Sequence, residues 1–216
     1  MPLSNQQIER YSRQIIVADV GGVAQERLLA ARIALVGSPT DVELVLHYLA
    51  GAGIGSIYLK SDGDDAVNRR LIDESREANP EVTVDAGTLP PKLDLILAMI
   101  GSAGSLPLAE ALADRRRNTP LIWVRLDSPE RIAILSEAPP CHRCARPSLV
   151  APFIERSARA GFIAMLAATE AFKLLIGDRK KDPTLIEFDG YRTQMSRLEA
   201  ASSTRCACRA TRPGPS

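Results

Sequence analysis

Residues 33–42 read IALVGSPTDV, an apolar strand that runs into a turn and then into a helix. The helical pattern extends over residues 41–52, and a second apolar strand follows at 56–60. A strand, a turn, a helix and a second strand in this order open a nucleotide-binding α/β unit. This stretch therefore predicts a doubly wound, Rossmann-like sheet.

The turn itself departs from the glycine pattern of such units. A G-x-G-x-x-G turn lets phosphates approach backbone N–H groups at the start of the helix. Here only Gly37 fits that pattern. Pro39 has no N–H, Asp41 is anionic, and Val42 puts a branched side chain where bare backbone is needed. The framework predicts a nucleotide fold, and the turn predicts a nucleotide site that is damaged or rebuilt.

Thr40 and Glu43 have the spacing of a helix capping box. In that arrangement the Thr40 hydroxyl accepts from the N–H of Glu43, and the Glu43 carboxylate reaches back to the cap. We expect a structural helix whose start satisfies its own donors and leaves fewer of them for a phosphate.

The composition is that of an ordinary soluble domain. The chain has 216 residues, of which 45% are hydrophobic and 25% charged, with a formal net charge of +1. This charge argues against a nucleic-acid binder, and the 4% of aromatic residues argue against a platform for stacking bases. The sequence shows neither a membrane span nor a signal peptide, so we expect a cytoplasmic protein that binds no nucleic acid and no membrane.

Strand and helix patterns alternate along the whole chain, which favours a mostly parallel, doubly wound sheet. We expect a single domain over residues 1–208 and a flexible tail over 209–216. Beyond the opening unit, strands are expected at 82–84, 93–98, 121–124, 131–135 and 185–188, and helices at 4–16, 22–31, 63–79, 106–117 and 151–176.

The four cysteines form two close pairs, Cys141 with Cys144 and Cys206 with Cys208. Without a secretory signal, paired cysteines are more often metal ligands than disulfides. We expect a structural Zn²⁺ that ties the end of the chain to the core, although Cys-x-Cys is a tighter chelate than Cys-x-x-Cys. His142 as a replacement ligand, unbound thiols and a redox pair remain alternatives.

The sequence contains five short motifs whose order along the chain is informative. They are ERYSRQI at 9–15, YLAGAGIG at 48–55, Asn-Pro at 79–80, PCHRC at 140–144 and TEAFKLL at 169–175. In this order they resemble the ThiF/MoeB/HesA proteins, bacterial relatives of ubiquitin-activating enzymes. The resemblance implies ATP- and Mg²⁺-dependent adenylation of the C-terminal glycine of a ubiquitin-like sulfur carrier, in thiamine, molybdopterin or related pathways. It also implies a P-C-x-x-C zinc knuckle at the cysteines.

The resemblance also assigns site residues, with several departures. Asp62, or Asp64 after a small shift, falls near the family's ribose-binding acid, and Arg69 falls on a triphosphate-binding arginine. The segment that usually follows, with a phosphate-contacting lysine, is absent from the sequence. Gly101 stands where the family has the catalytic aspartate that helps to hold Mg²⁺. The crossover loop that carries a transfer cysteine in some relatives is nearly gone.

Arg13 is retained, and in the family it reaches across a dimer interface into the partner's ATP site. The alternative is a surface ion pair of Arg13, for example with Glu9. Our first hypothesis is an adenylation-defective subunit that pairs with itself or with an intact ThiF/MoeB-like subunit. The second is a working adenylyltransferase resting on Gly37, Asp62, Arg69 and Arg13, and the third is a zinc-stabilised module that binds another small molecule.

Overall fold

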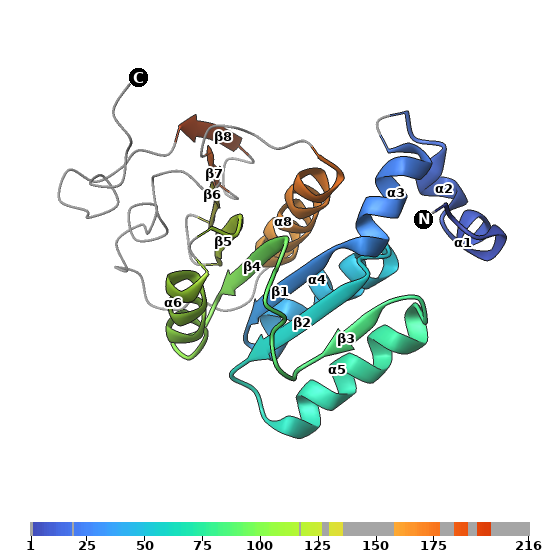
Figure 1. Cartoon of the computed structure of the whole chain (residues 1–216). Helices are drawn as coiled ribbons and strands as arrows, with labels where there is room; N and C mark the ends of the chain where they lie inside the picture. The colour runs from blue at the N-terminus through green and yellow to red at the C-terminus, as the bar shows by residue number, and fades with distance from the viewer. Residues whose placement is uncertain are drawn as a thin grey trace, which may run out of the picture.

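The structure is a computed structural model in which residues 2–18, 20–116, 118–126, 130–135, 158–177, 184–189 and 194–199 are described. Figure 1 shows how the helices and strands are arranged. The helices are α1 (Asn5–Arg10), α2 (Ser12–Ile15), α3 (Gly21–Ala30), α4 (Pro39–Gly51), α5 (Asp65–Ala78), α6 (Ser105–Arg115) and α8 (Ala158–Ile176). The strands are β1 (Arg32–Gly37), β2 (Ser56–Ser61), β3 (Thr83–Asp85), β4 (Leu95–Ile100), β5 (Leu121–Arg125), β6 (Glu130–Leu135), β7 (Thr184–Asp189) and β8 (Gln194–Glu199).

The strands form one eight-stranded sheet in the order β3-β2-β1-β4-β5-β6-β7-β8. The first five strands pair in parallel, as the alternation of strands and helices predicts. The last three pair antiparallel, which makes the sheet more mixed than expected. Strand β8 was not predicted, because QMSRLE lacks the continuous apolar run of a buried strand.

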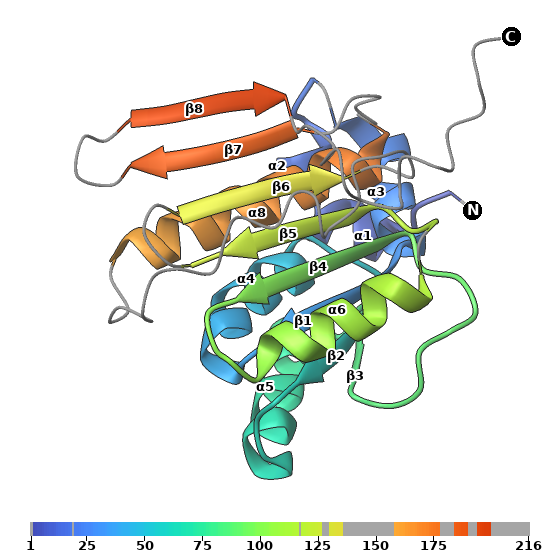
Figure 2. The ribbon, with the colours of Figure 1, turned by 90° about the vertical axis from the view of Figure 1, so that its left-hand side faces the viewer.

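Helices cover both faces of the sheet, and this confirms the doubly wound arrangement (Figure 2). Helices α4 and α8 lie on one face, over a core that includes Leu35, Leu97 and Ile122. Helix α6 lies on the opposite face, against Val36 and Trp123. Helix α4 packs there because its apolar residues follow the helical period, at Val42, Val45, Leu46 and Leu49.

The N-terminal helix is broken where a single helix over residues 4–16 was expected. Its start is as predicted: Ser4 caps α1 in a capping box with Gln7. Tyr11 then leaves the helical conformation and separates α1 from α2. The break turns the Tyr11 ring inward, where it is 1% exposed, while α1 and α2 themselves contain no buried residue.

Tyr11 is held by a buried polar junction at the C-terminal ends of α4 and α5. The side-chain amide of Asn79, which is 1% exposed, donates to the Tyr11 hydroxyl at 2.9 Å and to the carbonyl of Ala50 at 2.7 Å. The Tyr11 ring lies so close to Gly53 that a Cβ there would approach Cζ to 2.7 Å. Burial raises the pKa of Tyr11, so the phenol keeps its proton at neutral pH.

Two of the predicted segments lie wholly or partly outside the described residues. The flexible tail at 209–216 lies outside the described residues, as does the first part of the helix expected over 151–176. Among the described residues, every helix is too short or too polar to cross a bilayer.

We predict that Asn79→Ala lowers the free energy of unfolding by about 2–3 kcal/mol, because it leaves a buried hydroxyl and a buried carbonyl without their donor. Urea unfolding measures the change. Asn118→Ala is the matched control, since Asn118 is exposed and should change stability by less than about 0.5 kcal/mol. Equal stability of the two variants would contradict the structural role of the junction.

Candidate functional site

The candidate site lies at the carboxyl ends of β1 and β4. The chain leaves β1 through α4 to one side of the sheet and leaves β4 through α6 to the other side. Doubly wound sheets bind ligands at this reversal of strand order, outside the carboxyl ends of the strands. Three loops meet there: residues 38–39 after β1, 62–64 after β2, and 101–104 after β4.

The predicted capping box is wrong, because α4 begins earlier than expected. Ser38 is the N-cap, Pro39 is the first helical residue, and Thr40 already lies inside the helix. The N–H groups of Asp41 and Val42 donate to the Ser38 carbonyl at 2.9 and 3.1 Å. Since Pro39 has no N–H, the turn still has few free donors, as the sequence led us to expect.

Gly37 ends β1 at a close approach to β4. A Cβ at this position would come within 2.8 Å of both the Met99 carbonyl oxygen and the Val42 side chain. A glycine is therefore required for the packing of α4 and β4 around the end of β1, whether or not a ligand binds.

Asp41 and Gly101 meet at the reversal point itself. The Asp41 side chain, on a residue that is 9% exposed, accepts a hydrogen bond from the Ser38 hydroxyl at 2.6 Å. A Cβ on Gly101 would lie 2.5 Å from Asp41 Oδ2 and 2.6 Å from Oδ1. A carboxylate from α4 thus occupies the space that a side chain at position 101 would take. The sequence marked both residues singly and gave no sign of this contact.

Close contacts of the same kind also join the loop after β2 to the loop after β4 and to the start of α4. The Ser102 hydroxyl donates to Asp62 at 2.9 Å, and a Cβ on Gly104 would approach Asp62 Oδ2 to 2.2 Å. The Pro39 ring lies over Gly63, where a Cβ would be 2.2 Å from Cγ.

The alternative acid, Asp64, has a structural role instead. It caps α5 by accepting from the Val67 N–H at 2.8 Å. Of the two candidates for the ribose-binding acid, only Asp62 therefore contacts the loop that follows β4.

Arg69 lies outside this cluster. It is exposed, and its Nε donates to the carbonyl of Asp65 one turn earlier in α5, at 3.1 Å. Nothing in these contacts brings Arg69 to the Gly37 turn or to Asp62.

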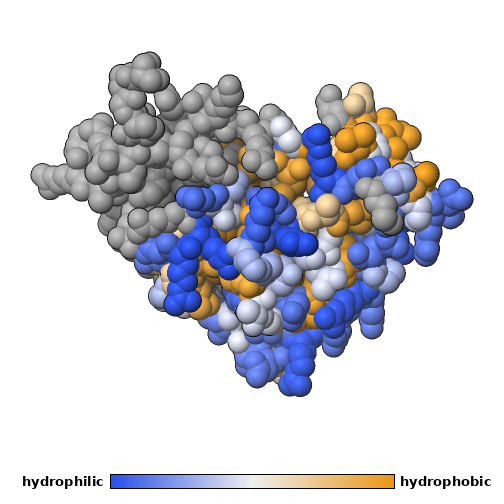
Figure 3. All heavy atoms as spheres, viewed as in Figure 1, coloured by the Kyte–Doolittle hydropathy of each residue, from blue (hydrophilic) through white to orange (hydrophobic). Residues whose placement is uncertain are grey.

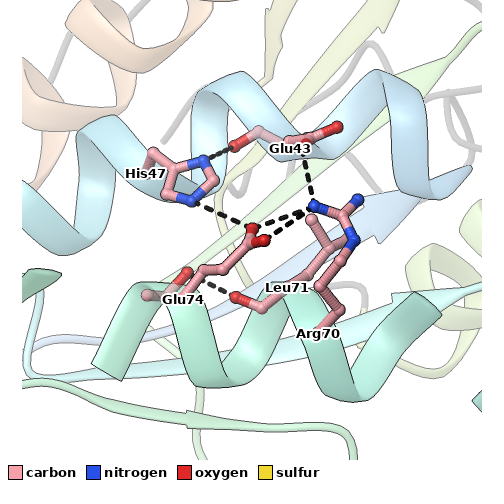
Figure 4. A network of polar contacts seen from close by, with 6 residues as sticks. Glu43, His47, Arg70, Leu71 and Glu74 are labelled. Carbon is pink, nitrogen blue, oxygen red and sulfur yellow. Dashed lines mark hydrogen bonds and ion pairs between the residues drawn. The ribbon is translucent and has the colours of Figure 1, made fainter. Parts of the chain in front are cut away.

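The neighbouring Arg70 joins α5 to α4, a link that the sequence reading did not include (Figure 4). It pairs with Glu74 at 2.9 Å and with Glu43 at 3.2 Å. The hydrogen bond to Glu74, followed by that to Glu43, raises the pKa of Arg70, so it stays charged. His47 bonds through Nδ1 to the Glu43 carbonyl at 2.9 Å, and its Nε2 lies 3.7 Å from Glu74.

Arg13 lies on α2, at the far end of α4 from the three loops (Figure 1). Tyr11 fixes the adjoining turn against Gly53, just beyond the C-terminus of α4. Thirteen helical residues separate this point from Pro39, a distance of about 20 Å. Within the part of the chain that is described, the Arg13 side chain forms no ion pair or hydrogen bond, so the alternative pairing with Glu9 is not found there.

The expected zinc ligands Cys141, Cys144, Cys206 and Cys208 lie outside the described residues, as does His142. Among the residues that are described, no group of three or more His, Cys, Asp or Glu side chains is arranged to hold a metal ion.

A groove of about 540 Å³ lies at the opposite, amino-terminal edge of the sheet. Charges of both signs line it, from Lys92, Arg115 and Arg116 and from Asp94 and Asp114. Arg116 spans part of it, donating to the carbonyls of Pro90, at 2.8 Å, and of Pro91. The groove is remote from the three loops.

Comparison with known proteins gives relatives over most of the chain, although no family model matches it. Protein HesA, vegetative, of Trichormus variabilis is 28% identical over 211 residues, which cover 81% of this chain and 78% of that protein. The SAMP-activating enzyme E1 of Haloferax volcanii is 26% identical over 226 residues, which cover 88% of this chain and 84% of that enzyme. The adenylyltransferase and sulfurtransferase UBA4 of Eremothecium gossypii is 26% identical over 96% of this chain, which spans only 56% of that relative.

Solved structures agree on the fold. MccB of E. coli with ATP superposes with a TM-score of 0.72 at 15% identity, covering 92% of this chain and 73% of MccB. MccB in complex with N-formylated MccA superposes with a TM-score of 0.70 at 15% identity, and the match covers 96% of this chain and 77% of that MccB chain.

Fold and relatives together define the class of the protein. The sheet order, the helices on both faces and the loops at the strand reversal are those of a doubly wound, Rossmann-like α/β domain. Within that class the chain is similar over most of its length to relatives of the ThiF/MoeB/HesA type, the resemblance that its motifs indicated.

Proposed function

We propose that this chain is an adenylation-defective member of the family that acts as a partner or binding subunit in the activation of a ubiquitin-like sulfur carrier. The observation that carries the proposal is the contact of the Asp41 carboxylate with Gly101 at the strand reversal. A nucleotide phosphate placed there would meet a carboxylate instead of bare backbone, with Pro39 offering no N–H. The residues present therefore do not fit the triphosphate of ATP.

The named activities of the relatives support the pathway part of the proposal. UBA4 is an adenylyltransferase and sulfurtransferase, and the Haloferax relative activates SAMP proteins. We extend to this chain the general role of binding such a carrier, in the cytoplasm. Arg69 and Asp62 are remnants of an ATP site under this proposal, and a working site resting on Gly37, Asp62 and Arg69 is the competing function.

The N-terminal arm, α1 to α3, supports a role in binding a partner. Tyr11 and Asn79 hold this arm at the end of α4, although no residue of α1 or α2 is itself buried. Figure 3 shows hydrophobic surface over this arm. The exposed apolar residues of the arm include Ile8, Ile16, Val17 and Val23, which are 47%, 81%, 49% and 66% exposed. Exposed apolar residues grouped in this way are typical of protein interfaces.

The same geometry favours an intact subunit as the partner. The length of α4, about 20 Å, separates the turn next to Arg13 from the strand reversal of the same chain, so we infer that Arg13 serves the site of another chain. In a homodimer it would face a second crevice filled by Asp41. A heterodimer with a family member that keeps its glycine loop gives the guanidinium a phosphate to bind.

The four cysteines complete the proposal as ligands of one structural Zn²⁺. The support is chemical: thiolates in pairs, with a tetrahedral site that needs four of them.

ATP with Mg²⁺ should give no heat in a calorimeter up to millimolar concentration when titrated into the folded, zinc-loaded chain, because the crevice is filled. The Arg69→Ala variant is the control for specific binding. Heat at micromolar ATP that disappears in Arg69→Ala would establish the competing function, that of a working adenylyltransferase.

Arg13→Ala should reduce the chain's stimulation of an intact family member from the same organism by about tenfold or more, because it removes a charged contact to phosphate. ATP–pyrophosphate exchange by the intact enzyme is the measurement. Arg10→Ala, on the neighbouring exposed turn, is the matched control. Equal stimulation by the wild type and by Arg13→Ala would rule out a role in trans.

Purified protein should contain one zinc ion per chain by mass spectrometry of the metal, and Cys141→Ser should lose it. His142→Ala should keep the zinc if the four thiolates complete the site. Wild-type protein without metal, or full occupancy in Cys141→Ser, would contradict the zinc proposal.

A further inference from the structure

The groove at the amino-terminal edge of the sheet has no part in the proposed function. Its volume of about 540 Å³ lies within the range of about 300–1,000 Å³ that is typical of small-molecule sites. Three segments line it: residues 91–94, which lead into β4, residues 114–116 at the end of α6, and residues 118–120, which lead into β5. Because the strand reversal lies at the other edge of the sheet, a ligand in this groove would be separate from any nucleotide.

The walls of the groove are held in place by contacts within the protein. The Arg116 guanidinium donates to the carbonyl of Pro90 at 2.8 Å and to that of Pro91, and so ties the loop before β4 to the end of α6. The Asp94 carboxylate accepts from the backbone N–H of Arg32 at 2.9 Å, which anchors the same loop to β1. A groove that is already formed costs little rearrangement when a ligand binds.

Two basic side chains of the groove are not used by these contacts. Lys92 and Arg115 are exposed and come from different walls. Within the part of the chain that is described, neither side chain forms an ion pair or a hydrogen bond. The two acids of the groove are already engaged, because Asp94 accepts from Arg32 and Asp114 is not free either. The positive charges of the groove are therefore the ones that a ligand can meet.

The end of α6 offers a simpler role for these cations, because basic residues interact favourably with the last carbonyls of a helix. Backbone donors already serve part of this end: the N–H of Arg116 donates to the Leu112 carbonyl at 3.0 Å, and that of Thr119 donates to the Arg116 carbonyl at 2.9 Å. Lys92 lies outside the helix, in the loop before β4. The helix end therefore does not account for both cations.

We propose that this groove binds a small organic anion with a carboxylate or phosphate group, held between Lys92 and Arg115. A guanidinium can bind either group through two parallel hydrogen bonds, and the ammonium of Lys92 adds a compact charge. The amide of Asn118 and the hydroxyl of Thr119, in the third wall, are able to bond to further polar atoms of the ligand. This site goes beyond the proposed function and does not depend on it.

The test follows backbone amide chemical shifts of the wild-type chain during titration with inorganic phosphate and, separately, with succinate, at constant ionic strength. We expect saturable shifts at residues 91–94, 114–116 and 118–120 with at least one probe, at about 1–10 mM. Tighter binding of phosphate would indicate a phosphate monoester as the ligand, and tighter binding of succinate a carboxylate. An absence of saturable shifts with both probes would overturn the proposal.

The double variant Lys92→Ala/Arg115→Ala should bind the preferred probe about tenfold more weakly or worse, because both charged contacts are lost. Arg10→Ala/Arg69→Ala is the matched control, since it removes two exposed positive charges outside the groove and should bind as the wild type does. Melting temperatures show that the variants fold. Equal binding by wild type and Lys92→Ala/Arg115→Ala would overturn the proposal.

The same variants separate this site from the proposed function. Heat from ATP that Arg69→Ala removes and Lys92→Ala/Arg115→Ala retains would overturn the adenylation-defective function and leave the groove unaffected. Heat from ATP that only Lys92→Ala/Arg115→Ala removes would come from the groove and support this inference.

Discussion

The buried amide of Asn79 is the interaction on which the arrangement of the N-terminal arm depends. It joins the Tyr11 hydroxyl to the carbonyl of Ala50, and so ties the arm to the ends of α4 and α5. Helices of six and four residues are too short to be stable alone in water. Because α1 and α2 bury no residue of their own, they are fixed against the domain by Tyr11 and by the hydrogen bond that the Gln7 side chain donates to Glu81 at 2.7 Å.

This junction brings together residues from three of the sequence motifs. Tyr11 belongs to ERYSRQI, Gly53 to YLAGAGIG and Asn79 to the Asn-Pro pair, and the three meet at one end of α4. The departures from the family pattern, in the glycine turn and at Gly101, meet at the other end. Helix α4 thus separates the arm that keeps these motifs from the loops in which the sequence departs from the family pattern.

Much of this fold could be predicted from periodicity, and the contacts of the site could not. The buried strands IALVG and LILAMI and the period of α4 are local signals, so their elements were predicted to within a few residues. The antiparallel pairing of β6 to β8 depends on long-range partners that no local pattern records. The predicted capping box of Thr40 and Glu43 was wrong because Pro39 fits the first helical position. The helix therefore begins at Pro39, and Ser38 is its N-cap.

The glycines of this chain lie in other loops than the glycines of a nucleotide-binding turn. In a nucleotide-binding turn the glycines lie in the loop after β1, where their lack of a side chain admits a phosphate. In this chain Gly63, Gly101 and Gly104 lie in the two facing loops, and each admits a side chain of the protein: Pro39, Asp41 and Asp62. The loops therefore pack on one another as they would otherwise pack on a ligand. Pro39, Asp41 and Asp62 thus hold the three loops against one another from within the protein itself.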